Sequence, residues 1–378
     1  MKINIGVGSD MFRLVKREFR LIFGDSGAML LLLFAMLIYA TIYSIAYGAE
    51  VVEGVAIAVV DEDNTTSSRD IVSGLRAGDN TIVAYEVQSV EEGKELFYNR
   101  EVYGIVVVPD GFERRLLSMQ GATISLILDG SHLLLYRAVL EQTMADVLDR
   151  SGGIVELSSE ILYNRPLGYG SFVMPSIVVL LIQQTLLIGV GMVAIRRRRH
   201  SGLIKRITWT YSLWQVLSII LTHIVIYGVS LTLVLATLWQ IFGFPFNGDI
   251  GDIILFMALY IIASSSLAQT LSHLFKRREA PILTLLWTSV PILLLAGVSY
   301  PREAFPEWLY AVGRLFPSSS AVDGFISLNT VGASLQNIKP EVVDMLILAF
   351  LYIFIAIILE KHELNSKKYR NLDVGNGE

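Results

Sequence analysis

Four consecutive arginines form the longest run of basic side chains in the sequence. They follow an apolar run that ends at Ile195, and a second basic turn, "LIKRI", comes shortly after them. Guanidinium groups bind carboxylates and phosphates, so this segment can dock on the surface of a partner protein. It can also do no more than fix the orientation of a membrane span. The basic segment comprises Arg196, Arg197, Arg198, Arg199, His200, Lys205 and Arg206.

The sequence contains no residue set with the spacing of a familiar catalytic, metal or nucleotide site. Gly93-Lys94 lacks the upstream glycine of a phosphate loop. The run "DEDNTTS" has Thr66 and Val72 where a calcium loop has Gly and Glu. The five histidines are scattered, and there is neither HExxH, G-x-S-x-G nor any cysteine. We therefore expect no catalysis, metal or cofactor in this chain.

The composition is typical of a membrane protein. Hydrophobic residues make up 53% of the 378 residues and charged residues 17%, with a mean hydropathy of +0.56. The segment 49–170 holds 20 acidic against 9 basic residues, whereas the remaining 256 residues hold 15 against 21. Two different environments are thus expected along one chain.

Six apolar stretches are long enough to be candidates for membrane spans, which need about 20 residues. They are Ala28–Tyr47, Phe172–Ile195, a stretch within Leu213–Phe242, a stretch within Ile253–Phe275, Pro281–Val298 and Val342–Leu359. The last is the least regular, because Asp344 lies at its start.

Lysine and arginine are concentrated in every second connection between these stretches. The N-terminal flank, the segment after the second stretch, "KRR" at 276–278 and the C-terminal flank are basic, whereas the connection between the third and fourth stretches has no basic residue. By the positive-inside rule, both termini and the four arginines face the cytoplasm, and the acidic segment 49–170 faces outside.

The stretch "DMFRLVKREFRLIF" before the first span predicts an amphipathic helix at the membrane interface. Its apolar residues fall on one side and its basic residues on the other, which also suits a soluble helix packed on a partner. The residues that we expect to act at the interface are Phe12, Arg13, Arg17, Phe19 and Arg20.

A few polar residues lie inside the predicted spans. They are Gln183, Gln184, Thr222 and His223. A polar group at that depth normally faces the helix bundle or a wet cavity. Two interpretations stay open: hydrogen bonds between helices, which we favour, and a place on a translocation path.

The external segment alternates between strand and helix patterns. "GVAIAVVD", "TIVAYEV", "VYGIVVVP" and "ATISLIL" predict strands, separated by helices that begin with Ser or Asp, and a last helix starts near Leu133 and reaches the region of Ser158. Continuous Val/Ile runs are typical of strands covered on both faces, so we expect an α/β domain.

Prolines and aromatic residues punctuate the segment between the fifth and sixth spans, "GVSYPREAFPEWLYAVGRLFPSSSAVDGF". It is too apolar for a free loop and too interrupted for a span. We expect short helices that dip into the outer leaflet over 301–325. Its marker residues are Pro301, Pro306, Trp308, Phe316 and Pro317.

The expected fold class is an α-helical polytopic membrane protein with six transmembrane helices and an inserted extracytoplasmic α/β domain. The expected boundaries are an interfacial helix over 1–26, the first span over 27–48, the α/β domain over 49–170, spans two to six over 171–360 and a cytoplasmic tail over 361–378.

The interfacial helix, "VVDEDNTTSSRDI" and the Pro-x-x-x-x-Pro-x-Trp segment, with its later Phe-Pro, together resemble the membrane subunits of ABC-2 type ABC exporters. The resemblance covers essentially the whole chain and extends to the subgroup with a large external domain between spans one and two. It implies a permease of the prokaryotic cytoplasmic membrane that dimerises, with itself or a related permease, and binds a separate ATPase, which holds ATP and Mg²⁺.

In this resemblance the loop over 196–207 corresponds to the coupling helix on the ATPase. The family often shows an acidic-Gly-Thr pattern there, whereas this chain has His200-Ser201-Gly202-Leu203. A lipid, a hydrophobic drug or a polymer on a lipid carrier would suit the apolar walls as substrate. A periplasmic adaptor and membrane lipids are further expected partners, and nucleic acid is not.

Three other classes compete with this interpretation. A membrane-anchored binding or adhesion module would not need six spans. An ion-coupled transporter would want carboxylates within the spans, whose interiors contain none. An intramembrane enzyme would need a nucleophile and a base, and no such set is recognisable.

Overall fold

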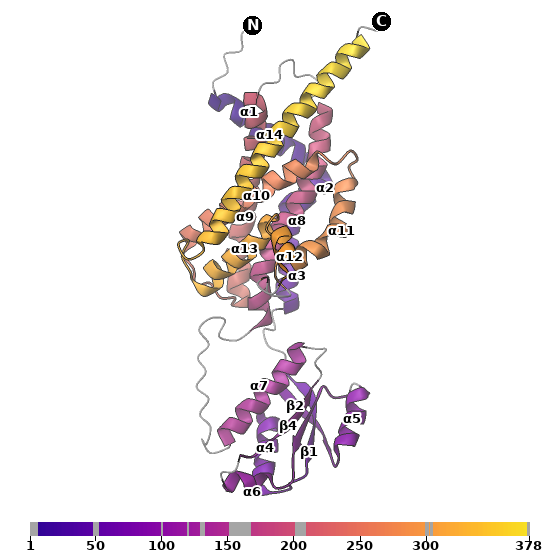
Figure 1. Ribbon diagram of the computed structural model, residues 1–378, viewed down its shortest axis with the longest axis vertical. Coiled ribbons are helices and arrows are strands. Elements are labelled where there is room, and N and C mark those ends of the chain that lie inside the picture. The colour runs from indigo at the N-terminus through magenta and orange to yellow at the C-terminus, as the bar shows by residue number, and fades with distance from the viewer. Residues whose placement is uncertain are drawn as a thin grey trace. The chain divides into compact units, whose positions relative to one another are not determined.

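The computed structural model describes residues 7–47, 53–99, 101–118, 121–128, 133–150, 168–200, 209–298, 302 and 305–375. The chain divides into two compact units, which are described separately (Figure 1). Residues 1–48 and 169–378 form a helical unit, and residues 49–168 form an α/β unit.

The helical unit is built from long apolar helices and a few short ones. Its first part contains α1 (Val7–Phe23) and then α2 (Ser26–Met29), η1 (Leu30–Phe34) and α3 (Ala35–Tyr47) in direct succession. The second part contains α8 (Tyr169–His200), α9 (Trp209–Phe242), α10 (Ile250–Ser272), α11 (Ala280–Leu295), α12 (Glu307–Gly313), α13 (Pro317–Ile326), η3 (Ser327–Val331) and α14 (Lys339–Gly375).

Within the described residues, five helical stretches have the length and apolarity of membrane spans. They are Ser26–Tyr47, Tyr169–Arg198, Trp209–Phe242, Ile250–Ser272 and Lys339–Glu363. The chain is therefore a multi-pass helical protein, but six spans are not confirmed, because the expected fifth span over Pro281–Val298 is not among the five. In its place α11 has 16 residues, about 24 Å of helix against a ~30 Å hydrocarbon core. Gly297 has a φ of +82° just after α11, a conformation that ends helices.

Helix α8 is the central helix of this unit. Of its most apolar stretch, 83% is buried, whereas the corresponding figure for α14 is 22%. Gly189 lets η1 approach α8 closely, because a Cβ at this position would lie 2.4 Å from the Leu32 Cγ atom. The resulting core is aliphatic around α8 and includes Met174, Val178, Ile182 and Leu186.

The α/β unit contains a four-stranded sheet in the order β2-β1-β3-β4. Its strands are β1 (Val55–Asp61), β2 (Thr81–Val87), β3 (Gly104–Val108) and β4 (Ser125–Leu128). Strand β1 pairs in parallel with β2 and β3, and β3 pairs antiparallel with β4.

Helices cover both faces of this sheet (Figure 1). They are α4 (Thr66–Ala77), α5 (Val90–Tyr98), α6 (Phe112–Leu117) and α7 (Leu133–Arg150). Side chains of α4, α6 and α7 join one hydrophobic cluster, and those of α5 join the cluster on the opposite face. The predicted α/β class is thus confirmed; the region of Ser158, where we expected the last helix to end, lies outside the described residues.

Candidate functional site: the basic end of the helical unit

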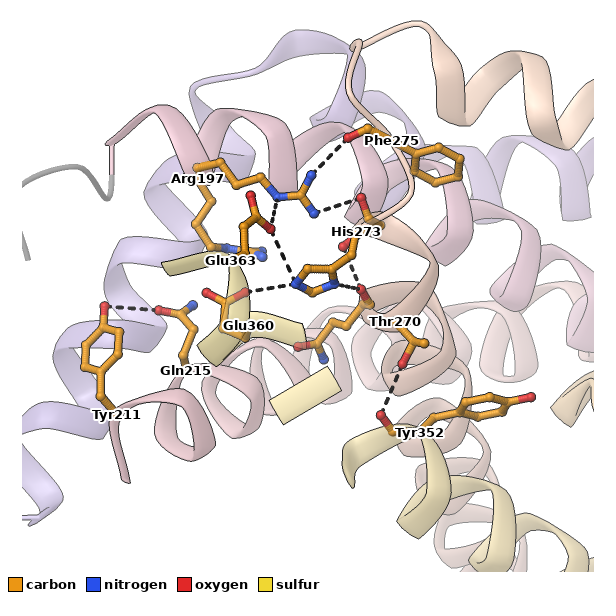
Figure 2. A network of polar contacts seen from close by, with 12 residues as sticks. Arg197, Tyr211, Gln215, Thr270, His273, Phe275, Tyr352, Glu360 and Glu363 are labelled. Carbon is orange, nitrogen blue, oxygen red and sulfur yellow. Dashed lines mark hydrogen bonds and ion pairs between the residues drawn. The ribbon is translucent and has the colours of Figure 1, made fainter. Parts of the chain in front are cut away.

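Charged side chains gather where α1, the last turn of α8, the end of α10 and residues 360–363 of α14 meet. We refer to this region as the basic end. Figure 2 shows part of its polar network, including Arg197, His273, Glu360 and Glu363. Among the described residues, no group of three His, Cys, Asp or Glu side chains has the arrangement of a metal site.

Glu18 and Arg197 form a buried ion pair between α1 and α8. The Arg197 Nε–H donates to the Glu18 Oε2 atom over 3.0 Å, and a second nitrogen of the guanidinium contacts the other carboxylate oxygen. The exposed fraction of the side chain is 1% for Glu18 and 7% for Arg197. Because a charge in this environment is costly without its partner, the pair fixes the position of α1 on α8.

The neighbouring residue Arg17 holds α1 to α9. Its guanidinium donates to the Tyr211 hydroxyl over 3.2 Å and to the amide oxygen of Gln215. Arg17 and Glu18, two consecutive residues of α1, therefore bind two different long helices, α9 and α8. Both form charge-assisted hydrogen bonds, which are stronger than neutral ones.

Arg198 joins α8 to the end of α10 and to Glu363 of α14. It donates to the carbonyl oxygens of Phe275, over 2.9 Å, and Ser272, over 2.8 Å. Its Nε atom also lies 2.9 Å from a carboxylate oxygen of Glu363. A cation at the C-terminal end of a helix satisfies carbonyls that have no partner within the helix.

His273, just after α10, faces two carboxylates of α14. Its Nδ1 atom lies 2.9 Å from the Gln269 carbonyl oxygen and must carry a proton there, since a carbonyl only accepts. The Nε2 atom lies 3.4 Å from Glu360 and 3.6 Å from Glu363 (Figure 2). The basic end thus contains acidic groups as well, and they connect α10 with α14.

The structure corrects the prediction that the connecting loop begins at Arg196. Helix α8 continues through His200. Arg197 and Arg198 form hydrogen bonds and ion pairs with other helices of the unit. Arg196 donates to the Leu21 carbonyl over 3.4 Å. The side chains of Arg199 and His200 are not described, and Lys205 and Arg206 lie outside the described residues. A docking role for this segment stays a prediction.

The predicted interfacial helix α1 presents a mixed surface. Phe12, Arg13 and Arg20 are exposed and Phe19 is half-buried, whereas Arg17 points into the protein. The helical wheel put Arg17 on the basic side of the helix. In the structure its guanidinium donates to Gln215 and Tyr211 of α9. A role of α1 at the membrane interface stays a prediction.

The predicted polar residues of the spans are mostly used in hydrogen bonds. The side-chain amide of Gln183 both accepts from the Ser318 backbone N–H and donates to its hydroxyl, each over 2.9 Å. The Thr222 hydroxyl donates to the Ser218 carbonyl, and the His223 Nδ1 atom lies 2.8 Å from the Ser265 hydroxyl. The Oε1 atom of Gln184 is buried without a partner among the described residues. Bonding between or within helices thus accounts for Gln183 and Thr222.

The proline-rich segment forms two short helices at the opposite end of the unit. Pro306 precedes α12 and Pro317 opens α13, whose N-cap is Phe316. Trp308 is exposed, while most of α13 is buried in the helical unit. Pro301 lies outside the described residues, and insertion of the segment into a leaflet stays a prediction.

Sequence reasoning missed the acidic partners of this network. Glu18 is the only acidic residue between Met11 and Ile22, where it interrupts a basic face. That isolation was a usable signal, because an acid among arginines on one helix suggests a specific cationic partner. No local pattern identified Glu360 or Glu363, since their partners lie on other elements.

Comparison with known proteins adds a family to this geometry. The model of the family described as "ABC-2 family transporter protein" matches residues 27–358. The "Probable multidrug ABC transporter permease YbhR" of Escherichia coli (strain K12) is 21% identical over 348 residues, covering 89% of this chain and 94% of the relative. The "Inner membrane transport permease YhhJ" of the same organism is 21% identical over 374 residues, covering 92% and 96%.

One solved structure is also similar in part. It is a crystal structure of a domain of a protein described as an ABC type-2 transporter, from Thermotoga maritima MSB8. It covers 25% of this chain and 68% of that domain, at 18% identity and a TM-score of 0.23. At this TM-score the likeness carries no argument about the fold.

Proposed function

The chain belongs to the ABC-2 family of transporter proteins. We propose that it forms the translocation path of an exporter driven by a separate cytoplasmic ATPase. As an ABC transporter permease it is a transport subunit rather than a catalytic chain, and the family itself binds no cofactor. ABC permeases pair with ATPase subunits. The direction of transport, the substrate and the route of coupling are the parts that we infer.

The basic end faces the cytoplasm in this proposal. Lys276, Arg277 and Arg278 extend it beyond the network described above, and all three are exposed. Basic residues close to span ends are retained on the cytoplasmic side. The α/β unit, with its acidic composition, is then extracytoplasmic, and the membrane is the cytoplasmic membrane of a prokaryote.

The attachment of α1 to both α8 and α9 is the observation that supports coupling of ATP hydrolysis to transport through the basic end. ATP binding draws two ATPase subunits together, and that motion must reach the spans through a stiff element. Glu18 and Arg17 tie α1 to α8 and α9, so a displacement of α1 moves both helices instead of being absorbed in a hinge. The segment 196–207 supplies the second contact with the ATPase.

The substrate proposed is amphipathic: a lipid-like molecule or a hydrophobic drug. The apolar composition of the candidate spans supports this class, and the name of YbhR refers to multidrug transport. A second permease copy or a related permease completes the path, and a periplasmic adaptor is a further candidate partner. The alternative is a membrane-anchored external binding module without an ATPase.

A charge-exchange experiment tests the coupling. The full chain is co-expressed with the ATPase that purifies with it, and vanadate-sensitive ATP hydrolysis and efflux of a lipophilic fluorescent cation are measured in proteoliposomes. We expect Glu18→Arg to reduce efflux at least tenfold while the ATPase stays bound, and Glu18→Arg with Arg197→Glu to recover much of it. Arg314→Gln is the matched control at the opposite end.

Two results would count against this function. Efflux at the wild-type rate in Glu18→Arg would show that the attachment of α1 to α8 does not couple ATP hydrolysis to transport. A chain that purifies from native membranes without any nucleotide hydrolase would favour the external binding module.

A further inference from the structure

A pocket of about 370 Å³ opens at the basic end, beside the network described above. It lies where α1 ends and α2 begins, against the last turns of α8 and against Arg278, two residues before α11. Its lining includes Gly24, Asp25, Met192, Ile195, Arg196 and Arg278. Neither the ion pair of Glu18 nor the contacts of Arg198 belong to it.

Two guanidinium groups line this pocket. Arg196 lies against the backbone of Gly24, where a Cβ atom would come within 2.8 Å of both terminal nitrogens. The absent side chain at Gly24 thus leaves room for the guanidinium beside the pocket floor. Arg278 forms an ion pair with Asp25 through one nitrogen, and 51% of its side chain is exposed.

The single acid of the pocket is neutralised. The Asp25 Oδ1 atom accepts from the backbone N–H groups of Gly27 and Ala28, each over 3.1 Å, and it also pairs with Arg278. Among the described lining residues, two arginines and one aspartate give one net positive charge. Arg278 keeps donors beyond the one that it gives to Asp25, because a guanidinium carries five N–H groups.

Apolar surface adjoins these charges at the level of the span ends. Met192 and Ile195 lie in the pocket lining. Phe23 and Leu30, on either side of the Gly24–Met29 segment, are both exposed large hydrophobic residues. The first candidate span begins at Ser26 and the second ends at Arg198, so the pocket lies close to an end of each. In the orientation proposed above, this level is the membrane–water boundary. A basic pocket at that depth with apolar flanks matches a molecule with an anionic head and an acyl tail.

We propose that this pocket binds the phosphate headgroup of an anionic phospholipid, with Arg196 and Arg278 on the phosphate and the acyl chains along Phe23 and Leu30. Planar guanidinium groups are suited to bidentate phosphate binding. The proposal does not depend on the exporter function. With the orientation given above, the lipid belongs to the inner leaflet.

The test uses the purified full chain in detergent and native mass spectrometry. It is titrated with dioleoylphosphatidylglycerol and, separately, with dioleoylphosphatidylcholine. We expect the anionic lipid to bind more tightly, and Arg196→Gln with Arg278→Gln to weaken its binding about 25-fold, since each of the two basic residues contributes roughly a fivefold effect. Binding of the zwitterionic lipid should stay unchanged. Arg277→Gln, an exposed neighbour outside the pocket lining, should change affinity less than twofold.

A gain-of-affinity variant separates binding from misfolding. Asp25→Asn removes the negative charge but keeps a side-chain oxygen that caps α2. Tighter binding of phosphatidylglycerol in this variant, about fivefold, supports the proposal, because a damaged fold would not produce it. Unchanged binding in Asp25→Asn, or an equal loss in Arg277→Gln, would overturn it. Complete displacement of the lipid by millimolar inorganic phosphate would assign the pocket to free phosphate instead.

Discussion

Glu18 in the helical unit and Asp63 in the α/β unit are both carboxylates that join segments distant in sequence, yet they are neutralised in different ways. Glu18 is buried and pairs with Arg197. Asp63 is half-buried and accepts backbone N–H groups from Gly111 over 2.8 Å, Phe112 over 3.1 Å and Glu113 over 2.9 Å. The Thr65 hydroxyl donates to it over 2.6 Å.

The difference shows how burial decides what a carboxylate requires. A carboxylate removed from water needs a full opposite charge, because desolvation costs several kcal/mol per ion. At Asp63 water remains nearby, and the partial charges of a helix N-terminus are enough. Desolvation raises the pKa of Asp63, but the hydrogen bonds from Thr65 and from the backbone of Glu113, Gly111 and Phe112 outweigh it and lower the pKa below its ordinary 3.8.

The largest expected effect comes from separating the buried pair. Glu18→Gln removes the carboxylate that pairs with Arg197, whose side chain is 7% exposed, so we expect a loss of about 3–5 kcal/mol in stability. Thermal melting of the full chain in detergent measures this loss. Glu18→Gln with Arg197→Met should recover most of it, because both charges of the buried pair are then removed. If the double variant melts as low as the single one, the ion pair is not what holds α1.

A second, smaller effect is expected at Arg302, which lies at the opposite end with its side chain 5% exposed. It donates to the Ser319 carbonyl over 2.7 Å, pairs with Asp323 and lies 5.2 Å from the centre of the Tyr310 ring. Unlike Arg197, it faces a half-exposed acid. Arg302→Gln should cost about 1.5–3 kcal/mol and should speed hydrogen exchange in α13. Exchange in α13 at the wild-type rate would contradict this role.

The sequence predicted the features that depend on local patterns and missed those that depend on partners distant in the chain. Hydrophobic periodicity and Val/Ile runs predicted the long helices and an α/β domain with strands covered on both faces, because those signals are local. Basic flanks located the basic end for the same reason. The partners of Glu18 and Arg198 could not be predicted, since Arg197 is 179 residues from Glu18 and Glu363 is on α14. The length of the fifth apolar helix was missed because Gly297 ends it early.

The contribution of Asp63 to stability should depend on pH. Because the folded-state pKa of Asp63 is lowered, its contribution is full above the ordinary value of 3.8 and disappears as the pH falls through the folded-state pKa. Asp63→Asn should therefore cost about 1 kcal/mol at neutral pH, as for a lost helix cap. Hydrogen exchange of α6 in the full chain reports this difference, which should vanish in strong acid. A difference that persists there would show that charge is not responsible.

The smallest effect on stability is expected at Arg314 and Asp344. They form an ion pair that is more exposed than the pair of Glu18 and Arg197. The side chain of Arg314 is 49% exposed and that of Asp344 is 16% exposed, and Ser320 also donates to Asp344 over 3.3 Å. Water screens the arginine, and Asp344 retains the Ser320 hydroxyl after the change. Arg314→Gln should therefore cost less than about 1 kcal/mol, and added salt should reduce the difference further. Melting in low and high salt tests this; a cost equal to that of Glu18→Gln would show that burial is not what separates the two pairs.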